Sequence, residues 1–523
     1  MFILKSIIDK YINNNNNKKK DKQDKLNKIF VGFVDFRKAF DSIWRKGLYY
    51  KLLKNNINGN IYYLIKNMYE DINYRIKLNN GITSNFKSLR GVRQGCNISP
   101  ILFNLFLNDL PNKLDESCKP VKLDVESLNS LLYADDLVLM SETEEGLQNC
   151  FNKLSGYCNS WNLEVNTAKT KVIIFNKNGR LLNQKYSFRY RDEEIDIVRN
   201  YKYLGIVFKP SGKFDLAKEQ LYKKAMKAFF YIKKVINSYT NISITTWINI
   251  FDHVIRPILT YGCEIWGIEK YTDKTYIEKL NLKLCKMLLQ VNQSATNLAV
   301  RGELGRYPLS IFIQKMMFRY WHRNSTKKEN SLVYDAVLCN IDTQSPWAKL
   351  MQDISDEVVI RNYWDGNRNG IHEISNKIEL DYVTKWKKEI KADRSRSGQN
   401  NKLRTYSTFK KEFKMEEYLI NVKEKNCRKY ICKYIEKGRH IRPKIDVEER
   451  KCNKCDTDTV EDEFHYIITC PHYKEIRKKL FDSIDQRNQQ FNSLSNEDKF
   501  AYIMSNASTH IDLGVYIKES GIF

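Results

Sequence analysis

Two adjacent aspartates interrupt an otherwise apolar stretch of this chain. Asp135 and Asp136 stand at the centre of LLYADDLVLM (131–140), whose other residues are all hydrophobic. An ionised carboxylate removed from water is costly unless a counter-charge compensates for it. Acidic side chains crowded beside apolar strands are typical ligands of Mg²⁺, a hard cation that prefers oxygen donors. The pattern therefore predicts a divalent-metal site.

A second apolar run supplies a third carboxylate. Asp35 directly follows KIFVGFV (28–34), which is dense in β-branched and aromatic residues and predicts a buried strand. If this strand lies beside residues 131–140 in one sheet, Asp35, Asp135 and Asp136 converge. Three carboxylates can hold two Mg²⁺ ions roughly 3.5–4 Å apart and so stabilise an in-line phosphoryl displacement. We therefore expect a protein that makes or cuts phosphodiester bonds.

Composition agrees with a phosphate-rich partner. The 523 residues include 88 Lys and Arg against 62 Asp and Glu, a net charge of +26. This excess favours nucleic-acid binding through counterion release, although a bias toward Lys and Asn, as in residues 13–28, is an alternative. The twelve cysteines are scattered and do not resemble a disulfide framework. No apolar run approaches the roughly 20 residues that span a bilayer, so we expect an intracellular, soluble protein without a membrane partner.

The elements that would position these groups alternate between strands and helices. Residues 131–140 fit a strand–turn–strand with the acidic pair at its tip, and Ser99 is a candidate N-cap of a helix whose first residue is Pro100. The remaining expectations are an amphipathic helix at 1–12, helices at about 42–54 and 60–70, a hairpin turning at 79–81, and mostly helical, basic sequence from about 209 to 445.

The chain contains five ordered motifs: FVDFRKAFD, GVRQGCNISPILFN, YADD, LEVNTAKTK (163–171) and YKYLGIVF (201–208). They resemble motifs A, B, C and D and the primer-grip hairpin of reverse transcriptases, and more closely those of non-LTR retrotransposons, including jockey-like elements. RPILTYGCEIWG (256–267) and RGELGRYPL (301–309) resemble the family's thumb. The resemblance covers most of residues 28–480.

The resemblance assigns roles to the acidic residues and to one aromatic residue. It makes Asp35 and Asp135 the principal Mg²⁺ ligands, with Asp136 as a neighbouring acidic member. Phe40 matches the bulky position that excludes a ribose 2′-hydroxyl and so selects deoxynucleotides. A phenylalanine that only packs a helix face is the alternative interpretation.

The resemblance also implies roles for four residues around the acidic group. Gln94 and Gly95 match the turn beside template and incoming nucleotide, where glycine lets the backbone approach nucleic acid closely. Lys169 matches a lysine that can protonate the departing pyrophosphate, and Tyr133 is expected near the primer end. The alternatives are an ordinary turn, a surface lysine and a packing aromatic.

A Cys/His segment near the C-terminus predicts a second metal site. Cys452, Cys455, His465 and Cys470 have the spacing C-x2-C-x9-H-x4-C, which suits tetrahedral Zn²⁺, and His472 is a rival fourth ligand. The segment resembles the C-terminal zinc-binding segment of many non-LTR reverse transcriptases. The acidic residues 461–463 would repel phosphate and favour a structural zinc, whereas the basic residues 428–444 are better phosphate contacts or a solvated face.

The resemblance implies an α/β (α+β) polymerase palm of antiparallel strands backed by helices. We expect, in chain order, a palm with partial fingers (1–208), a helical thumb (209–325), a helical basic connector (326–445), a zinc-binding segment (446–482) and a C-terminal tail (483–523).

The implied function is RNA-directed DNA polymerisation, with an RNA template, a DNA primer or target, deoxynucleoside triphosphates and two Mg²⁺ ions. No segment before Asp35 resembles the family's basic fingers motifs or its endonuclease, so we expect an N-terminally truncated element. The alternative is a catalytically silent RNA- or DNA-binding remnant. A group II intron maturase shares the palm motifs but not the thumb and Cys/His blocks, and Phe40 disfavours an RNA replicase. The family's habit of copying RNA at chromosomal sites leads us to expect a nuclear protein.

Overall fold

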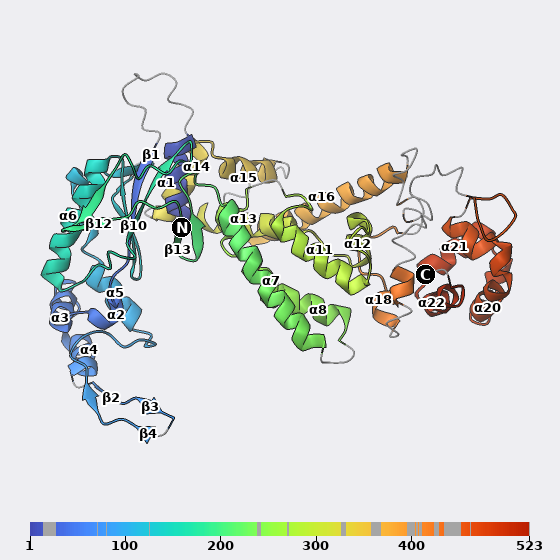
Figure 1. The fold of residues 1–523 in the computed structure, drawn as a ribbon, viewed down its shortest axis with the longest axis horizontal. Coiled ribbons are helices and arrows are strands. Elements are labelled where there is room, and N and C mark those ends of the chain that lie inside the picture. Colours follow the sequence, from blue (N-terminus) through green and yellow to red (C-terminus); the bar gives the residue numbers. More distant parts are fainter. Residues whose placement is uncertain are drawn as a thin grey trace, which may run out of the picture. The chain divides into compact units, whose positions relative to one another are not determined.

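The computed structural model describes the chain in segments. They are residues 1–13, 28–70, 72–79, 81–124, 126–237, 242–268, 271–325, 331–356, 368–394, 403, 406, 410–422, 428–432, 451–460 and 462–521. The chain forms two compact units, Met1–Ala217 with Trp321–Asp353, and Lys218–Tyr320 with Ile354–Phe523. Figure 1 labels the elements of both units.

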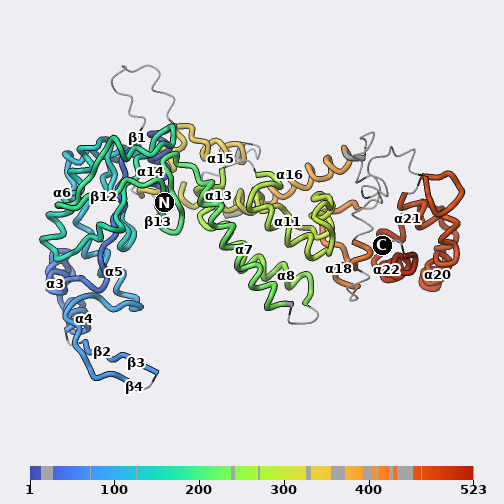
Figure 2. Tube along the Cα trace, in the orientation of Figure 1, coloured from blue at the N-terminus to red at the C-terminus, as the bar shows by residue number. Residues whose placement is uncertain are grey.

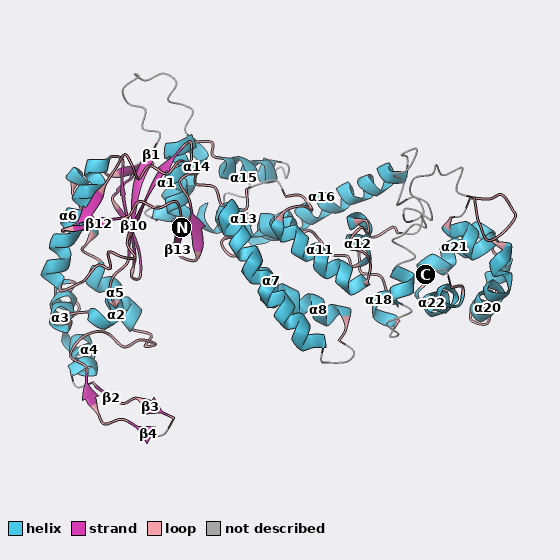
Figure 3. Ribbon diagram, viewed as in Figure 1, coloured by secondary structure: helices cyan, strands magenta, loops and turns pink. Residues whose placement is uncertain are grey.

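A four-stranded antiparallel sheet forms the centre of the first unit. Its order is β10 (Lys171–Asn176), β1 (Lys28–Val34), β9 (Asp136–Ser141) and β8 (Ser130–Tyr133). As the apolar run predicts, β1 is buried along nearly its whole length, and it pairs with β10 on one side and β9 on the other. The predicted strand–turn–strand at residues 131–140 is the β8–β9 hairpin. Figure 3 shows these strands among helices, whereas the second unit is drawn almost entirely as helix.

Helix α6 (Glu144–Trp161) covers one face of this sheet. Thr143 caps it by accepting a hydrogen bond from the Gly146 amide at 3.0 Å, and its buried stripe includes Leu147, Phe151 and Leu154. The helix approaches β1 so closely that a Cβ at Gly32 would lie 2.9 Å from the Phe151 ring. The packing of α6 on β1 therefore requires glycine at this strand position.

A segment far along the chain completes the first unit. Helix α14 (Leu332–Asp342) packs against α1 (Phe2–Asn13), and the Asn340 amide donates a 2.6 Å hydrogen bond to the Ser6 hydroxyl (Figures 1 and 2). Helix α1 also contacts the strands β1 and β10. It is therefore covered on most of its surface rather than along one amphipathic face. The described residues from 331 to 353 thus belong to the same compact unit as the sheet, whereas the sequence analysis assigns 326–445 to a connector.

Three helices and a small hairpin are among the elements between Asp35 and Asp135. They are α3 (Arg45–Lys54), α4 (Gly59–Glu70) and α5 (Ser99–Leu107), and the hairpin strands are β2 (Asn73–Tyr74), β3 (Lys77–Leu78), β4 (Gly81–Ile82) and β5 (Phe86–Lys87). The predicted hairpin is present, and Asn80 of its turn lies outside the described residues.

The prediction that Ser99 caps α5 is wrong. Ile98 is the N-cap, without a side-chain bond, and Ser99 is already the first residue of the helix, followed by Pro100. The Ser99 hydroxyl lies 3.1 Å from the Tyr69 hydroxyl instead, at a buried contact between α4 and α5. A tertiary partner therefore takes the hydroxyl that sequence assigned to the helix end.

The second unit is helical. Its main elements are α7 (Asp215–Asn237), α8 (Ile244–Ile250), α11 (Tyr276–Leu289), α12 (Asn297–Glu303), α13 (Leu309–Ser325) and α16 (Arg368–Arg394). A buried ion pair of 3.2 Å between Arg301 and Glu278 links α12 to α11. Arg301 also contacts Asp273 at 2.7 Å, and Arg306 contacts Asp252 at 2.7 Å. The two arginines of RGELGRYPL therefore serve packing. None of the described helices is both long and apolar enough to cross a membrane.

The C-terminal tail is folded together with the Cys/His segment. Helices α20 (Lys474–Asp485), α21 (Asn496–Ser505) and α22 (His510–Glu519) share one buried core with residues 464–473. Within it, the Tyr516 hydroxyl donates a 2.7 Å hydrogen bond to the Tyr466 carbonyl. Residues 483–521 are thus part of the folded end of the chain.

A buried lysine fixes α3 within the first unit. The Lys51 ammonium lies 2.7 Å from both the Asp109 carboxylate and the Tyr157 hydroxyl, and it also donates to the Phe106 carbonyl. It sits 3.7 Å from the centre of the Trp161 ring, a cation–π contact. One charge thus connects α3 with α6 and the end of α5.

Replacing Lys51 with alanine should destabilise the first unit by about 2–4 kcal/mol, because it leaves Asp109 and Tyr157 without their buried cation. Lys54→Ala, an exposed lysine on the same helix, should change stability by less than about 0.5 kcal/mol. Urea unfolding followed by tryptophan fluorescence measures both. Equal midpoints for the two variants would contradict the assignment.

Candidate functional site

Strand pairing brings the three aspartates to one end of the sheet. In the β1–β9 ladder Val34 pairs with Leu137, so Asp35 follows β1 where Asp136 begins β9. Asp135 lies in the turn between Tyr133 and Asp136, which pair with each other. Ala134 precedes it at φ 53°, a left-handed conformation that costs a non-glycine residue on the order of 1 kcal/mol or more. The turn is thus held in a strained form at the acidic pair.

The backbone of Asp35 is fixed from the other side by the loop that precedes β10. Its carbonyl accepts a 2.7 Å hydrogen bond from the Asn166 amide, and its amide donates to the Thr170 hydroxyl at 3.2 Å. An isolated bridge between Phe36 and Val165 extends this pairing. The segment 163–171 (LEVNTAKTK) therefore fixes the backbone of Asp35 by hydrogen bonds.

A cavity of about 340 Å³ opens beside these groups. It is lined by Asp35, Phe36, Arg37, Lys38, Ala39, Phe40, Gln94, Asp135, Asn166 and Lys169. Five residues singled out in the sequence, Asp35, Phe40, Gln94, Asp135 and Lys169, share this cavity. Asp136, Gly95 and Tyr133 are outside its lining.

The crowded carboxylates raise the energy of negative charge at this site. The pKa of Asp136 is raised, first by burial and then by the charges of Asp135 and Asp35. Lys169 gives partial compensation, with its ammonium 3.8 Å from the Asp35 carboxylate, but its side chain is 71% exposed. A cation coordinated by the carboxylates would relieve the remaining repulsion, so the donor set fits a divalent ion.

The nearby aromatic and motif B residues occupy defined positions. Phe40, in α2 (Ala39–Ser42), stacks on Phe103 with ring centres 4.6 Å apart while also lining the cavity. The Gln94 amide donates to the Asp41 carboxylate at 3.1 Å. Gly95 has φ 82°, a conformation that favours glycine, and no atom would lie within 4 Å of a Cβ there. Tyr133 is 66% exposed.

Sequence reasoning missed four residues at this site. Arg37, Lys38 and Asn166 line the cavity, and the Tyr201 hydroxyl has its pKa raised to about 12 by burial and then by Asp35 and Asp136. Arg37 and Lys38 stand directly after Asp35, and their position could have drawn attention to them. Tyr201 could not be found in this way, because only tertiary packing brings it near the carboxylates.

Asp136→Asn should raise the melting temperature in EDTA at neutral pH by roughly 1–3 °C. Because folding raises the pKa of Asp136, the wild-type protein loses folding stability as the pH rises through that raised pKa. The variant does not, since asparagine carries no ionisable group. The gain should vanish near pH 4, and Mg²⁺ should stabilise the wild type more than the variant. Scanning calorimetry with Asp192→Asn, an exposed control, measures this. A lower melting temperature of Asp136→Asn in EDTA would contradict it.

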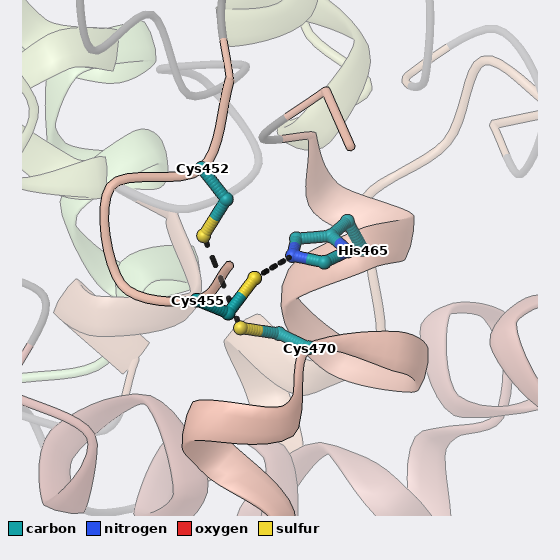
Figure 4. A group of neighbouring side chains, drawn as sticks. All are labelled: Cys452, Cys455, His465 and Cys470. Carbon is teal, nitrogen blue, oxygen red and sulfur yellow. Dashed lines mark hydrogen bonds between the residues drawn. The ribbon is translucent and has the colours of Figure 1, made fainter. Parts of the chain in front are cut away.

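The predicted Cys/His ligands converge in the second unit. The candidate ligand atoms of Cys452, Cys455, His465 and Cys470 all lie within 4.8 Å of one another (Figure 4). Cys452 Sγ is 3.9 Å from Cys470 Sγ, and Cys455 Sγ is 3.4 Å from His465 Nε2. A tetrahedron with Zn–S bonds of about 2.3 Å has sulfur–sulfur edges of about 3.8 Å, so this set fits Zn²⁺. His472 is exposed and outside the group.

Threonines hold the second nitrogen of the histidine ring. His465 Nδ1 lies 2.9 Å from the Thr469 hydroxyl and 3.1 Å from that of Thr459, which leaves Nε2 facing Cys455. The Asp462 carboxylate accepts a 2.7 Å hydrogen bond from the His465 backbone amide, and Glu463 is buried. Of the sequence features expected here, Glu461 and residues 433–444 lie outside the described residues.

Thr469→Val should weaken zinc binding roughly tenfold, because it removes the group that orients the His465 ring. Competition with a chromophoric chelator measures the affinity without any assay of activity. Thr245→Val, at an exposed position of α8, should bind zinc as the wild type does. Unchanged affinity in both variants would show that Thr469 does not position the ligand.

Comparison with known proteins adds a family to this geometry. Residues 4–208 match the sequence model of the family described as "Reverse transcriptase (RNA-dependent DNA polymerase)". The chain is 24% identical over 271 residues to the RNA-directed DNA polymerase from mobile element jockey of Drosophila melanogaster, covering 50% of this chain and 28% of that protein. It is 24% identical over 299 residues to the probable RNA-directed DNA polymerase from transposon BS of the same species, covering 56% and 32%.

Two solved telomerase structures, each in complex with a fragment of telomeric RNA, also show similarity. The protein from Candida albicans is 14% identical, with 65% of this chain and 54% of that chain covered and a TM-score of 0.28. The protein from Candida tropicalis is 12% identical, with 68% and 50% covered and a TM-score of 0.31. The chain spans less than a third of the length of the jockey and BS relatives.

Proposed function

We propose that this chain is an RNA-directed DNA polymerase of a non-LTR retrotransposon, because residues 4–208 match the sequence model of the reverse transcriptase family. One observation carries the proposal: the cavity beside the sheet contains Asp35 and Asp135 from separate motifs, together with Phe40, Gln94 and Lys169. Its substrates would be an RNA template, a DNA primer and deoxynucleoside triphosphates. The sheet unit would act as the polymerase palm.

The carboxylates provide the metal ligands in this proposal. Asp35 and Asp135 would bind two Mg²⁺ ions, with Asp136 beside them. The ions would stabilise the charge that develops on the attacking and leaving oxygens when the primer 3′-hydroxyl displaces pyrophosphate from the α-phosphate. The raised pKa of Asp136 supports this assignment, because burial first, and then the charges of Asp135 and Asp35, make an ionised carboxylate costly there without a counter-charge.

The other cavity residues would select and position the nucleotide. The Phe40 ring is held against Phe103, so it would block a ribose 2′-hydroxyl without moving aside. The exposed Lys169 ammonium lies 3.8 Å from Asp35 and would donate a proton to the departing pyrophosphate. Gln94 and Gly95 would contact the template or the incoming base, and Tyr133 the primer end.

The zinc site would serve the fold of the C-terminal segment. Its ligands share a buried core with α20, α21 and α22, so Zn²⁺ would tie the Cys/His turns to those helices. Because the proposed enzyme would copy RNA at chromosomal sites, we propose that it acts in the nucleus.

Asp135→Ala should reduce primer extension at least about 100-fold, because it removes one of the two principal metal ligands. Incorporation of labelled nucleotide on an oligo-dT primer annealed to poly(rA), with Mg²⁺, measures the rate. Asp192→Ala, at an exposed turn, should extend the primer as the wild type does.

The same assay separates the polymerase from a catalytically silent binding remnant. If the chain is a polymerase, the wild type should extend the primer and Asp135→Ala should still bind nucleic acid normally. Wild-type protein that retains primer–template but incorporates no nucleotide would contradict the polymerase and support the remnant.

A further inference from the structure

A two-stranded ribbon in the first unit presents apolar side chains to solvent. The ribbon comprises residues 72–79 and 81–90, and every residue in its four short strands is exposed. Figure 1 shows it projecting from the end of α4, away from the four-stranded sheet. Six large hydrophobic side chains on it are between 36% and 82% exposed: Tyr74, Ile76, Leu78, Ile82, Phe86 and Leu89. An isolated pair of strands is marginally stable in water, so this surface calls for a partner.

A buried arginine holds the ribbon at its base. The Arg45 guanidinium donates five hydrogen bonds, to the carbonyls of Tyr69, Ser88, Arg90 and Gly91 and to the Ser88 hydroxyl. These acceptors stand where the chain enters the ribbon and where it leaves. One side chain thus fixes both ends of the ribbon to α3, and the direction of the ribbon is set even though its surface is uncovered.

Charge on the ribbon has a single sign. Residues 72–108 contain five basic residues, Arg75, Lys77, Lys87, Arg90 and Arg93, and no Asp or Glu. Arg75, Lys77 and Arg90 pair with no carboxylate in the part of the chain that the structure describes. Beside them the Tyr74 and Phe86 rings stack at 27°, with centres 6.0 Å apart and both rings exposed. Unpaired cations beside exposed aromatic faces are the features that bind single-stranded nucleic acid.

We propose that this ribbon binds single-stranded nucleic acid, with unpaired bases on Tyr74 and Phe86 and phosphates on Arg75, Lys77 and Arg90. The aromatic faces favour an unpaired strand over a duplex, whose bases are stacked on each other. Like charge disfavours a second copy of the same ribbon. Arg90, at the base of the ribbon, stands four residues before Gln94 in the cavity wall, so the base of the ribbon connects directly to the candidate active site.

Fluorescence anisotropy with an oligouridylate, an oligothymidylate and a duplex of equal length tests the proposal on the full chain. Arg75→Gln combined with Lys77→Gln and Arg90→Gln should weaken single-strand binding about tenfold or more. The slope of log affinity against log salt should fall by about 2, since each phosphate contact on a single strand contributes about 0.7. Tyr74→Ala with Phe86→Ala should weaken binding about 5-fold to 100-fold with an unchanged slope.

A matched triple variant controls for general charge. Lys177→Gln with Arg180→Gln and Arg189→Gln removes three exposed cations elsewhere in the same unit and should leave affinity unchanged. Equal losses in the two triple variants, or unchanged single-strand binding in both ribbon variants, would overturn the proposal. Stronger binding of the duplex, or a change only in oligomeric state by light scattering, would overturn it in favour of a duplex or a protein partner. The two single-stranded probes show whether the ribbon prefers RNA or DNA.

This inference rests on geometry and charge outside the acidic cavity, so it can fail separately from the polymerase proposal. Asp135→Ala should bind single strands with wild-type affinity. Ribbon-dependent binding without primer extension by the wild type would refute the polymerase alone. Primer extension and single-strand binding that are both unaffected by the ribbon variants would refute the ribbon alone.

Discussion

The antiparallel pairing of β1 with β9 determines where the acidic groups lie. β1 is buried along nearly its whole length, and a shift of one residue would exchange the faces of the strand, so the register that pairs Val34 with Leu137 is strongly specified. That register brings Asp35 beside Asp136 at the end of the sheet. The core therefore gathers carboxylates that repel one another, and the pKa of Asp136 is raised first by burial and then by the charges of Asp135 and Asp35. A cation is the natural complement of this arrangement.

Buried and exposed basic side chains in the first unit have different roles. Arg45 and Lys51 are nearly covered, and each is surrounded by hydrogen-bond acceptors that it draws together from separate elements. Lys51 fixes α3 to α6, and Arg45 fixes the base of the ribbon to α3. Lys169, at the cavity, and Lys77, on the ribbon, are exposed. Arg45 and Lys51 thus stabilise the packing, whereas Lys169 and Lys77 are available to bind negatively charged ligands.

Local sequence predicted the parts of the site that local physics determines. The apolar run of β1, the β8–β9 hairpin and the Cys/His spacing each carry their own signal, and the structure contains all three. Local sequence did not predict the packing of α14 on α1, the effect of the Asp35 and Asp136 charges on Tyr201, or the folding of residues 483–521 onto the Cys/His segment. These features depend on partners far along the chain. Ser99 shows the same limit, because a tertiary hydroxyl contact displaced the predicted cap.

Binding of Mn²⁺ by zinc-loaded protein, followed by electron paramagnetic resonance of the free ion, tests the central claim most directly, since Mn²⁺ accepts the oxygen ligands that Mg²⁺ prefers. The wild type should bind Mn²⁺ without any nucleotide present. A protein with both Asp35→Asn and Asp135→Asn should bind at least about tenfold more weakly, because two carboxylate ligands of the cavity are lost. Equal binding by the two proteins would show that the sheet does not gather its aspartates into a metal site.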